Sequence, residues 1–423
     1  MIRACLVSLS GAIFFCATSV VAEPPSTATA KEPSRVQSGL DTLRDIATLR
    51  WLRGQSRHRQ EAALARLDQL DGEHEIEHDD RGRPFLVVTW NGGDEGLDQL
   101  RTLDELRWLD LSRTKVTDRG LVHLAALKRL QVLKLQQTRV SDAGLANLSE
   151  LTELQGLALH DTKISPAGLE HLRPLVNLKV LSLCWTRCGD EGLAAISACA
   201  KLEELYLYDA KITDNGTSHL ARLRNLRALK LSYNEITDPG VANLQGLPSL
   251  EALWLDFTQT GDAGLAHLQT LPSLRALYLG ESQVTDAGLG RLANIRTLEI
   301  LDLTNLPISD AGLKRIERLP ALQMLSLEGT AAGSDGMTSI GKLKNLTQLN
   351  VGSTDVDDRG VAALARLDQL TALNLSQTRV TDAALPHAKR WPRLEELNVR
   401  GTGMSQAALD ALEQSRPNLK IIR

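Results

Sequence analysis

The stretch that decides the fold runs from Leu274 to Ile295 and reads LRALYLGESQVTDAGLGRLANI. Its first apolar residues alternate, as in Leu277 and Leu279, and a period of two is typical of a strand with one buried face. In its second half the spacing widens to three, as between Leu289 and Leu292, which suits a helical turn. This one segment therefore predicts a strand, a turn and a short helix.

The same pattern recurs every 24 residues through 14 copies without an insertion. A glycine marks one position of the register, and alanine continues it in the last two copies: Gly96, Gly120, Gly144, Gly168, Gly192, Gly216, Gly240, Gly264, Gly288, Gly312, Gly336, Gly360, Ala384 and Ala408. One unit cannot bury its leucines alone, so successive units must stack into a continuous core. Helices are wider than strands, so the stack curves. We predict an α/β solenoid over residues 91–423, a horseshoe with a parallel concave sheet and convex helices.

Two polar positions recur with the leucines. An aspartate precedes the predicted helix at Asp118, Asp142, Asp190, Asp214, Asp238, Asp262, Asp286, Asp310, Asp358 and Asp382. No second carboxylate accompanies each one at ligand spacing, so we predict that each caps its own helix and does not bind calcium. A threonine stands in the turn at Thr114, Thr138, Thr162, Thr186, Thr258, Thr330, Thr354, Thr378 and Thr402, where its hydroxyl should bond the turn backbone.

This repeat resembles the leucine-rich-repeat family over about residues 82 to 423. Its T-D-x-G-L half is similar to the repeats of bacterial GALA-type proteins and of F-box substrate receptors, in which a cysteine often replaces the threonine. The resemblance implies a solenoid that binds proteins on its concave face. We find no F-box-like helical module before the array, which argues against an intracellular role in ubiquitination.

The N-terminal part is predicted to contain three segments. Residues 1–22 read as a secretory signal peptide, with Arg3 before an apolar stretch and the small residues Val20 and Ala22 at a cleavage site. An uncleaved membrane anchor is the alternative, and no other segment is apolar enough to cross a membrane. Residues 23–38 read as a disordered tether, and residues 39–90 as an N-terminal cap of a helix and a strand hairpin. We expect a secreted protein, periplasmic or extracellular.

Composition and motifs exclude several classes of function. The formal net charge is −4, without the basic excess of a nucleic-acid binder. Removal of the signal leaves three cysteines, which excludes a disulfide-built fold but permits one bridge. We find no phosphate loop or metal-ligand cluster, attribute His74 and His78 to an edge strand, and expect no cofactor. His160 and Cys184 fall at one position of adjacent repeats, so a nucleophile–base pair is the enzymatic alternative; without evident oxyanion donors we predict no enzyme.

Departures from the repeat point to a binding face. Aromatic residues form only 3% of the chain, yet all four tyrosines fall at strand positions that point away from the core. We predict that this concave patch binds a protein or peptide, with a glycan or cell-wall polymer as the alternative. The predicted contact residues are Trp185, Tyr206, Tyr208, Asp209, Lys230, Tyr233, Trp254, Phe257, Tyr278 and Glu281. Lys230 should lie between Tyr206 and Trp254 in cation–π contact. The oligomeric state stays open.

A second outward position alternates strictly in charge, through Lys179, Glu203, Arg227, Glu251, Arg275 and Glu299. Residues 24 apart should be neighbours on adjacent strands, so this order predicts a ladder of cross-strand ion pairs. Each exposed pair should contribute less than about 1 kcal/mol, so we interpret the ladder as structural.

Overall fold

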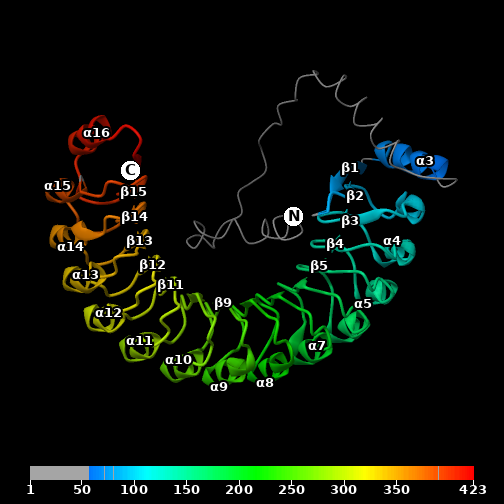
Figure 1. Ribbon diagram of the computed structural model, residues 1–423, viewed down its shortest axis with the longest axis horizontal. Coiled ribbons are helices and arrows are strands. Elements are labelled where there is room, and N and C mark those ends of the chain that lie inside the picture. The colour runs from blue at the N-terminus through cyan, green and yellow to red at the C-terminus, as the bar shows by residue number, and fades with distance from the viewer. Residues whose placement is uncertain (1–56, 71, 80, 389) are drawn as a thin grey trace. The chain divides into compact units, whose positions relative to one another are not determined.

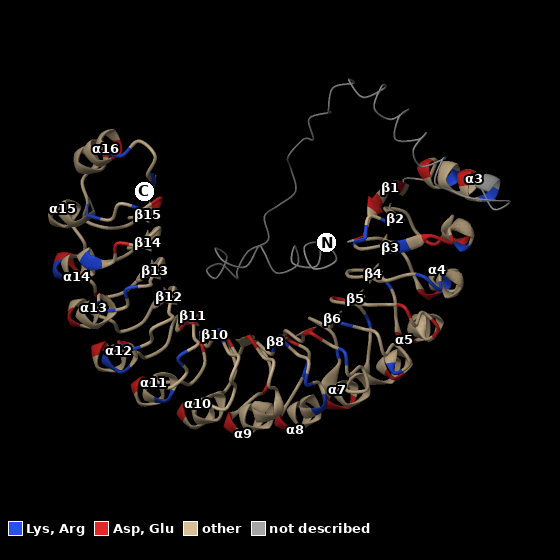
Figure 2. Cartoon of the chain, in the orientation of Figure 1, with Lys and Arg blue, Asp and Glu red and all other residues tan. Residues whose placement is uncertain are grey.

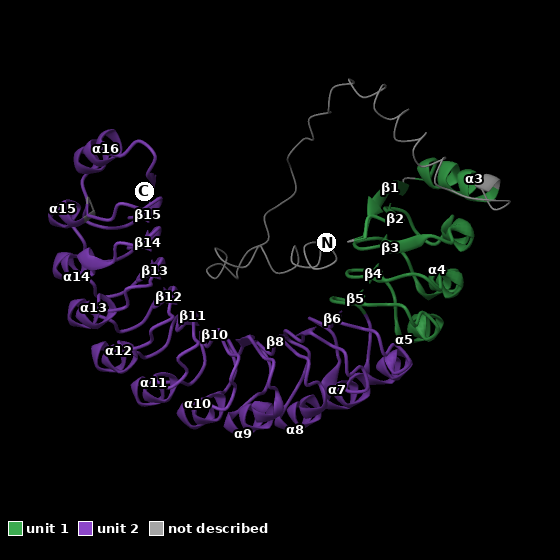
Figure 3. Cartoon of the chain, in the orientation of Figure 1, with its two compact units in different colours: residues 1–162 green, residues 163–423 purple. Residues whose placement is uncertain are grey.

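The computed structural model describes residues 57–423 except residues 71, 80 and 389. The predicted signal peptide, the tether and the first part of the cap lie outside the described residues. The chain forms two compact units, residues 1–162 and 163–423, and their boundary falls within the repeat array (Figure 3). The predicted domain boundaries stay predictions.

Unit 1 begins with a helix and a hairpin and continues with repeats. Strands β1 and β2 pair antiparallel, and β2 to β5 follow one another in parallel. Its elements are α3 (Arg57–Asp68), β1 (Gly72–His78), β2 (Pro84–Trp90), η1 (Leu97–Thr102), β3 (Leu106–Asp110), α4 (Asp118–Leu121), η2 (Leu124–Ala126), β4 (Val132–Lys134), α5 (Asp142–Leu145), η3 (Ala146–Leu148) and β5 (Gly156–Ala158), where η denotes a 3₁₀ helix. The predicted hairpin is confirmed.

Unit 2 contains parallel strands that follow one another in sequence order. Its strands are β6 (Val180–Ser182), β7 (Glu204–Tyr206), β8 (Ala228–Lys230), β9 (Ala252–Trp254), β10 (Ala276–Tyr278), β11 (Ile300–Asp302), β12 (Met324–Ser326), β13 (Gln348–Asn350), β14 (Ala372–Asn374), β15 (Glu396–Asn398) and β16 (Lys420–Ile422). Within this unit the strands line the inner side of a curve and the helices the outer side (Figure 1). We call the strand and following turn of one repeat a rung.

The helices of unit 2 are short, and many continue as 3₁₀ turns. They are α6 (Pro166–Leu169), η4 (Glu170–Leu172), α7 (Gly189–Ile196), α8 (Asp214–Thr217), η5 (Ser218–Arg222), α9 (Asp238–Ala242), η6 (Asn243–Gly246), α10 (Asp262–Leu268), α11 (Asp286–Leu292), α12 (Asp310–Ile316), α13 (Ser334–Ile340), α14 (Asp358–Ala363), η7 (Leu364–Arg366), η8 (Asp382–Ala384), α15 (Leu385–Ala388) and α16 (Gln406–Ser415). Among the described residues no helix combines the length and the apolar character needed to span a membrane.

The repeat register converts directly into strand pairing. Leu277 of β10 lies opposite Leu253 of β9 and Leu301 of β11, each 24 residues away. Leu277 is fully buried, and so is Leu279, the next residue on the same face. Neighbouring repeats therefore share one leucine core, and the predicted solenoid is confirmed.

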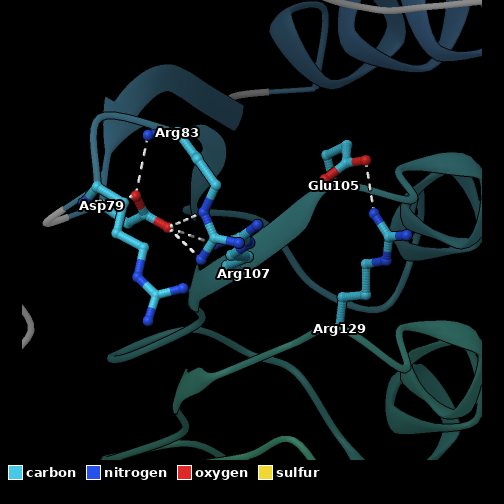
Figure 4. Close-up of polar contacts among 6 residues, drawn as sticks. Asp79, Arg83, Glu105, Arg107 and Arg129 are labelled. Atoms are coloured by element: carbon cyan, nitrogen blue, oxygen red, sulfur yellow. Dashed lines mark hydrogen bonds and ion pairs between the residues drawn. The ribbon is translucent and has the colours of Figure 1, made fainter.

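The carboxylate of Asp79 binds both the hairpin turn of unit 1 and the first repeat (Figure 4). Its Oδ1 accepts hydrogen bonds from the backbone N–H groups of Arg81 and Arg83, at 3.0 and 2.9 Å. Its Oδ2 accepts from the Nε of Arg83 at 2.8 Å and forms an ion pair with Arg107 of β3 at 3.5 Å. The bonds from Arg83 lower the pKa of Asp79 well below its usual range. The carboxylate thus joins the hairpin turn to the first repeat.

His74 of the hairpin makes a contact with the preceding helix. The Nδ1 of His74 in β1 lies 2.9 Å from Oδ1 of Asp68, at the end of α3. In the described part of the chain no three His, Cys, Asp or Glu side chains are grouped as metal ligands. His74 therefore links the cap helix to the hairpin.

The sequence predicted that each aspartate caps its own helix, and this prediction is wrong. The aspartates instead bridge to the next repeat. Asp262 is the first residue of α10, and its Oδ1 accepts from the backbone N–H of Thr285 at 2.8 Å, while its Oδ2 accepts from the hydroxyl of Thr285 at 2.6 Å. Thr285 is in turn the N-cap of α11, where its hydroxyl accepts from the N–H of Ala287. We call this arrangement the clasp. Where a side-chain cap forms, as in α4, α8, α11 and α12, the residue before the aspartate therefore supplies it.

The clasp recurs through most described repeats. Both hydrogen bonds are present for Asp94–Thr117, Asp118–Ser141, Asp190–Thr213, Asp214–Thr237, Asp262–Thr285, Asp286–Ser309, Asp358–Thr381 and Asp382–Ser405. Where glycine replaces the cap residue, at Gly261 and Gly333, the backbone bond alone remains, at 2.7 Å in each case. Figure 2 shows the acidic residues recurring along the helices α8 to α12.

The clasp also explains the repeated glycine. A Cβ atom at Gly288 would overlap the Oδ1 of Asp262, which is held in place by its two bonds to the next repeat. The left-handed backbone is not the reason, because Gly288 lies inside α11 and has no positive φ. Alanine takes this position at Ala384 and Ala408, and both clasp bonds persist there; the cap Ser405 has φ −77°, whereas Thr381 has φ −124°, close to the −121° of Thr285. In α11 the glycine therefore leaves room for the close approach of the Asp262 carboxylate.

Two repeat junctions of unit 2 depart from this scheme. At one, serine and aspartate exchange places: the hydroxyl of Ser334 donates to Oδ1 of Asp357 at 2.5 Å and accepts from the N–H of Asp357 at 3.0 Å. The hydrogen bond from Ser334 lowers the pKa of Asp357 to about 2. At the other, Pro166 replaces the aspartate and Gly189 the cap residue, with φ +61°. The clasp is thus inverted once and missing once.

The threonine prediction is confirmed. The hydroxyl of Thr258 donates to the carbonyl of Leu255 at 2.7 Å, and that of Thr330 donates to the carbonyl of Leu327 at 2.6 Å. Thr114, Thr138, Thr162, Thr186, Thr354, Thr378 and Thr402 make the same bond. This bond closes the turn between each strand and helix.

We predict that Gly288→Ala destabilises the protein and Gly290→Ala does not. Both residues lie in α11, but a Cβ at Gly290 would meet only the flexible side chain of Arg315, at 3.3 Å. Displacing the Asp262 carboxylate should cost about 1–2 kcal/mol, whereas alanine at position 290 should be neutral or gain up to about 1 kcal/mol in helix propensity. Urea unfolding measures both, and equal losses would contradict the clasp as the reason for the glycine.

We further predict that Ser334→Asp and Asp357→Thr compensate each other. The first change alone places two carboxylates opposite each other, and the second alone removes the charged acceptor. Together they restore the arrangement of the other repeats, so the double variant should be more stable than the sum of the single changes implies, by about 1 kcal/mol or more. A double-mutant cycle in urea measures this coupling. Strict additivity would refute the inverted clasp.

Candidate functional site

Four aromatic side chains form a continuous row across four rungs of unit 2. The ring centroids of Trp185 and Tyr208 lie 5.0 Å apart, and those of Tyr208 and Tyr233 lie 4.7 Å apart. Tyr233 and Phe257 stack at 4.1 Å with an interplanar angle of 25°. We call these four residues the aromatic row. The register thus brings together side chains up to 72 residues apart in sequence.

Three members of the row occupy a strained backbone position. Trp185, Tyr233 and Phe257 have φ values of 53°, 60° and 53°, in the left-handed region that favours glycine and asparagine. Other repeats of unit 2 place Asp209, Glu281, Asn305, Gly329, Ser353, Gln377 and Gly401 in this slot. A bulky ring there costs of order 1 kcal/mol, and such strain is concentrated at functional sites. The repeat itself does not require aromatic residues at this position.

The backbone beneath the row is fixed by hydrogen bonds. The N–H of Tyr233 donates to the carbonyl of Asp256 on the next rung, at 3.0 Å. The neighbouring Asn234 is buried and takes the threonine slot. Its Oδ1 accepts from the N–H groups of Ala210 and Ile212, at 3.1 and 3.0 Å, so it closes the turn of the preceding repeat, which has no threonine. The rings therefore project from a rigid support.

The predicted contact residues differ in how far their side chains are exposed to solvent. Trp185 is 55% exposed and Phe257 44%, and both are among the few large apolar side chains in the described part of the chain that face solvent. Tyr206 and Trp254 are half-buried, and Tyr278 is only 9% exposed, which corrects the prediction that the whole patch lies open. Among the rings of the patch, Trp185 and Phe257 at turn positions are therefore the most accessible to a partner.

Trp254 and Tyr278 form a second pair beside the row. Their rings are stacked, with centroids 5.0 Å apart and an interplanar angle of 5°. Tyr206, on the same strand position two rungs earlier, donates its hydroxyl to Oε2 of Glu204 at 2.8 Å. Burial raises the pKa of Tyr206 and Tyr278 well above the usual value, so both keep their proton at neutral pH.

Lys230 contacts a different ring from the predicted ones. Its Nζ lies 5.3 Å from the ring centroid of Tyr208, a cation–π distance. The prediction had placed it between Tyr206 and Trp254. Tyr208 lies on the preceding rung nearer the turn, and the aliphatic chain of a lysine is long enough to cross that distance.

The alternating charges form cross-strand ion pairs. These join Lys179 with Glu203 at 3.5 Å, Arg227 with Glu251 at 2.7 Å, and Arg275 with Glu299. Arg227 is bidentate, since its Nε and Nη2 donate to the two oxygens of Glu251 at 2.8 and 2.9 Å. Lys179, Arg227 and Arg275 are therefore all engaged in ion pairs.

Two carboxyl groups that the sequence did not single out as a site lie behind these side chains. Asp256 accepts from the hydroxyl of Ser232 at 3.0 Å and from the N–H of Gly280 at 3.2 Å. Asp302 accepts from the N–H and the hydroxyl of Thr304, at 2.9 and 2.5 Å. Desolvation and the neighbouring Asp302 raise the pKa of Asp256 to about 6, and desolvation raises the pKa of Asp302.

The three cysteines within the described residues, Cys184, Cys188 and Cys199, are unpaired thiols. Burial raises the pKa of Cys188 to about 12 and that of Cys199 to about 11, in keeping with core positions. Burial also raises the pKa of Cys184, so its thiol stays protonated at neutral pH and is a poor nucleophile. This weakens the alternative in which Cys184 acts as a nucleophile.

Comparison with known proteins matches the sequence to two family models. One, described as a leucine-rich repeat region, covers residues 97–291, and the other, described as a leucine-rich repeat, covers residues 342–365. A comparison with curated proteins finds no match.

Solved structures share the fold. An internalin from Listeria monocytogenes is 23% identical, with a TM-score of 0.59 over 77% of this chain and 88% of that protein. A leucine-rich-repeat protein from Leptospira interrogans is 19% identical, with a TM-score of 0.56 over 77% of this chain and 80% of that protein. Both likenesses support the same solenoid architecture.

We predict that Asp256→Asn stabilises the protein at neutral pH but not in acid. The folded state raises the pKa of Asp256 from 3.8 to about 6, so the stability that its proton contributes is complete below about pH 4 and is lost as the pH rises through about 6. The asparagine variant should gain about 2 kcal/mol over the parent at pH 8 and little at pH 4. The charged groups facing Asp256 are Asp302 and Lys230. Urea unfolding at both pH values tests this, and a pH-independent difference would contradict it.

Proposed function

Because the chain belongs to the leucine-rich-repeat proteins, we propose that it is a binding protein that recognises a protein or peptide partner on the inner face of unit 2. This family and fold are typical of binding scaffolds and not of enzymes. The partner contacts the aromatic row and the residues around it, which include Tyr206, Asp209, Lys230, Trp254, Tyr278 and Glu281.

The observation that carries this proposal is the presence of large rings at left-handed turn positions. Trp185 and Phe257 are exposed, so their rings gain little from burial to offset the backbone strain. Exposed aromatic residues are also enriched among the residues that dominate binding energy in protein interfaces. A side chain that strains the scaffold and remains accessible is best explained by contact with a partner.

The aromatic row is about as long as a short extended peptide. It crosses four rungs, and adjacent strands lie about 4.8 Å apart, so its length is about 15 Å. An extended chain rises about 3.3 Å per residue, which means that four to five residues of a partner would follow the row. The stacked rings present a stiff surface, because each ring is supported by the next.

We further propose that the protein is exported and acts in the periplasm or outside the cell. This part of the proposal is supported by the signal-peptide pattern of residues 1–22, which lie outside the described residues. A partner would then be another envelope or extracellular protein. A glycan is the alternative ligand, since exposed rings also stack on sugars, and it becomes an outcome of the test.

We predict that Trp185→Asn and Phe257→Asn each weaken binding without loss of stability. Asparagine tolerates the left-handed backbone, and the chain itself uses Asn305 in this slot. Peptides selected from a displayed random library on the full chain should bind each variant at least 10-fold more weakly, as expected for an interface anchor worth about 1.4 kcal/mol or more. The melting temperature should stay unchanged or rise.

Val176→Asn is the matched control, because Val176 is 50% exposed and lies outside the row. It should leave peptide affinity unchanged. Failure to select any peptide, or equal affinity in all variants, would refute the proposal. Selective retention on a polysaccharide column that depends on Trp185 would favour the glycan instead.

A further inference from the structure

The inner face of unit 2 carries more negative than positive charge around the aromatic row. Four cations on it are already paired, Lys179 with Glu203, Lys211 with Asp209, Arg227 with Glu251 and Arg275 with Glu299. Among the described residues, five further carboxylates accept hydrogen bonds from uncharged donors: Glu204, Asp256, Glu281, Asp302 and Glu328. This face is therefore complementary to a basic partner.

Asp256 and Asp302 are the most desolvated of these acids. Asp302 of β11 lies opposite Tyr278 of β10 in the strand register, and its charge disfavours ionisation of Asp256. Lys230 lowers the pKa of Asp256, but burial outweighs it and the net shift is upward.

Aromatic rings stand beside the pair. Tyr278 interacts electrostatically with both carboxylates and stacks on Trp254. The indole Nε1 of Trp254 is buried and has no hydrogen-bond acceptor among the residues that the structure describes. A buried donor without a partner is costly, so this ring carries an unsatisfied polar group beside the two acids. We call Trp254, Asp256, Tyr278 and Asp302 the acid–aromatic cluster.

We propose that the partner presents an arginine or lysine side chain to the acid–aromatic cluster, an inference that rests on the proposed function. The cation neutralises Asp256 and Asp302 and lies against the aromatic pair. Arginine fits best, because its planar guanidinium binds carboxylates with two hydrogen bonds and stacks on aromatic faces. The rest of the partner then follows the aromatic row.

Other ligands fit this cluster less well. An acidic segment would be repelled by the five carboxylates. A metal ion would need more donors, and the described residues hold no group of three or more His, Cys, Asp or Glu side chains suited to one. A basic peptide matches both the charge and the rings.

The test measures binding of tetra-arginine amide to the full chain by isothermal titration calorimetry, with tetra-glutamate as the control peptide. Asp302→Asn should weaken tetra-arginine binding at least 10-fold, and tetra-glutamate should not bind. The matched control is Asp355→Asn, which changes the net charge equally but removes an exposed carboxylate paired with Arg379 at 2.6 Å. Its affinity should stay within 2-fold of the parent. Asp302→Asn should fold, because burial already favours the neutral form of this side chain.

Equal losses in Asp302→Asn and Asp355→Asn, or no binding of tetra-arginine at all, would overturn the inference. The displayed-peptide selection separates this failure from failure of the proposed function. If selected peptides depend on Phe257 but carry no basic residue, the binding function stands and the basic partner is wrong. If no peptide is selected, the binding function itself fails.

Discussion

The hydrogen bonds between successive repeats are the constraint on which the rest of the structure depends. In each clasp, an aspartate such as Asp262 accepts two bonds from the cap of the next helix, and it lies against a glycine such as Gly288 that has no room for a Cβ. An inserted residue between them would break both contacts. Most repeats present donor, acceptor and gap at fixed positions, and this favours the uniform 24-residue period.

The same constraint leaves the inner face free to vary. The clasps act at the helix starts and the threonine bonds inside the turns, while the leucines fill the core. Side chains on the inner strand positions contribute little to either, so they can be chosen for binding. The left-handed turn position shows this freedom most clearly, since it holds Gly329 in one repeat and Phe257 in another.

The acidic residues of the scaffold and those of the inner face also differ in their pKa values. On the outer side, Asp357 has a lowered pKa because a hydroxyl and backbone N–H groups stabilise its ionised form. On the inner side, Asp256 has a raised pKa because it is buried near a second acid. Burial raises the pKa of the inner acids, whereas hydrogen bonds lower the pKa of the acid that holds the scaffold together. This difference distinguishes a structural aspartate from a candidate binding residue.

The sequence by itself determined the solenoid, the rung on which each residue lies and the concentration of aromatic residues, because a strict period fixes which residues are neighbours. It assigned the recurring aspartates to their own helices, since periodicity cannot distinguish a contact within a repeat from one with the next. It also missed Asp256 and Asp302 as a pair and assigned Lys230 to the wrong rings. Only the tertiary structure decided these points, because burial, ring stacking and side-chain reach depend on how far each group projects between rungs.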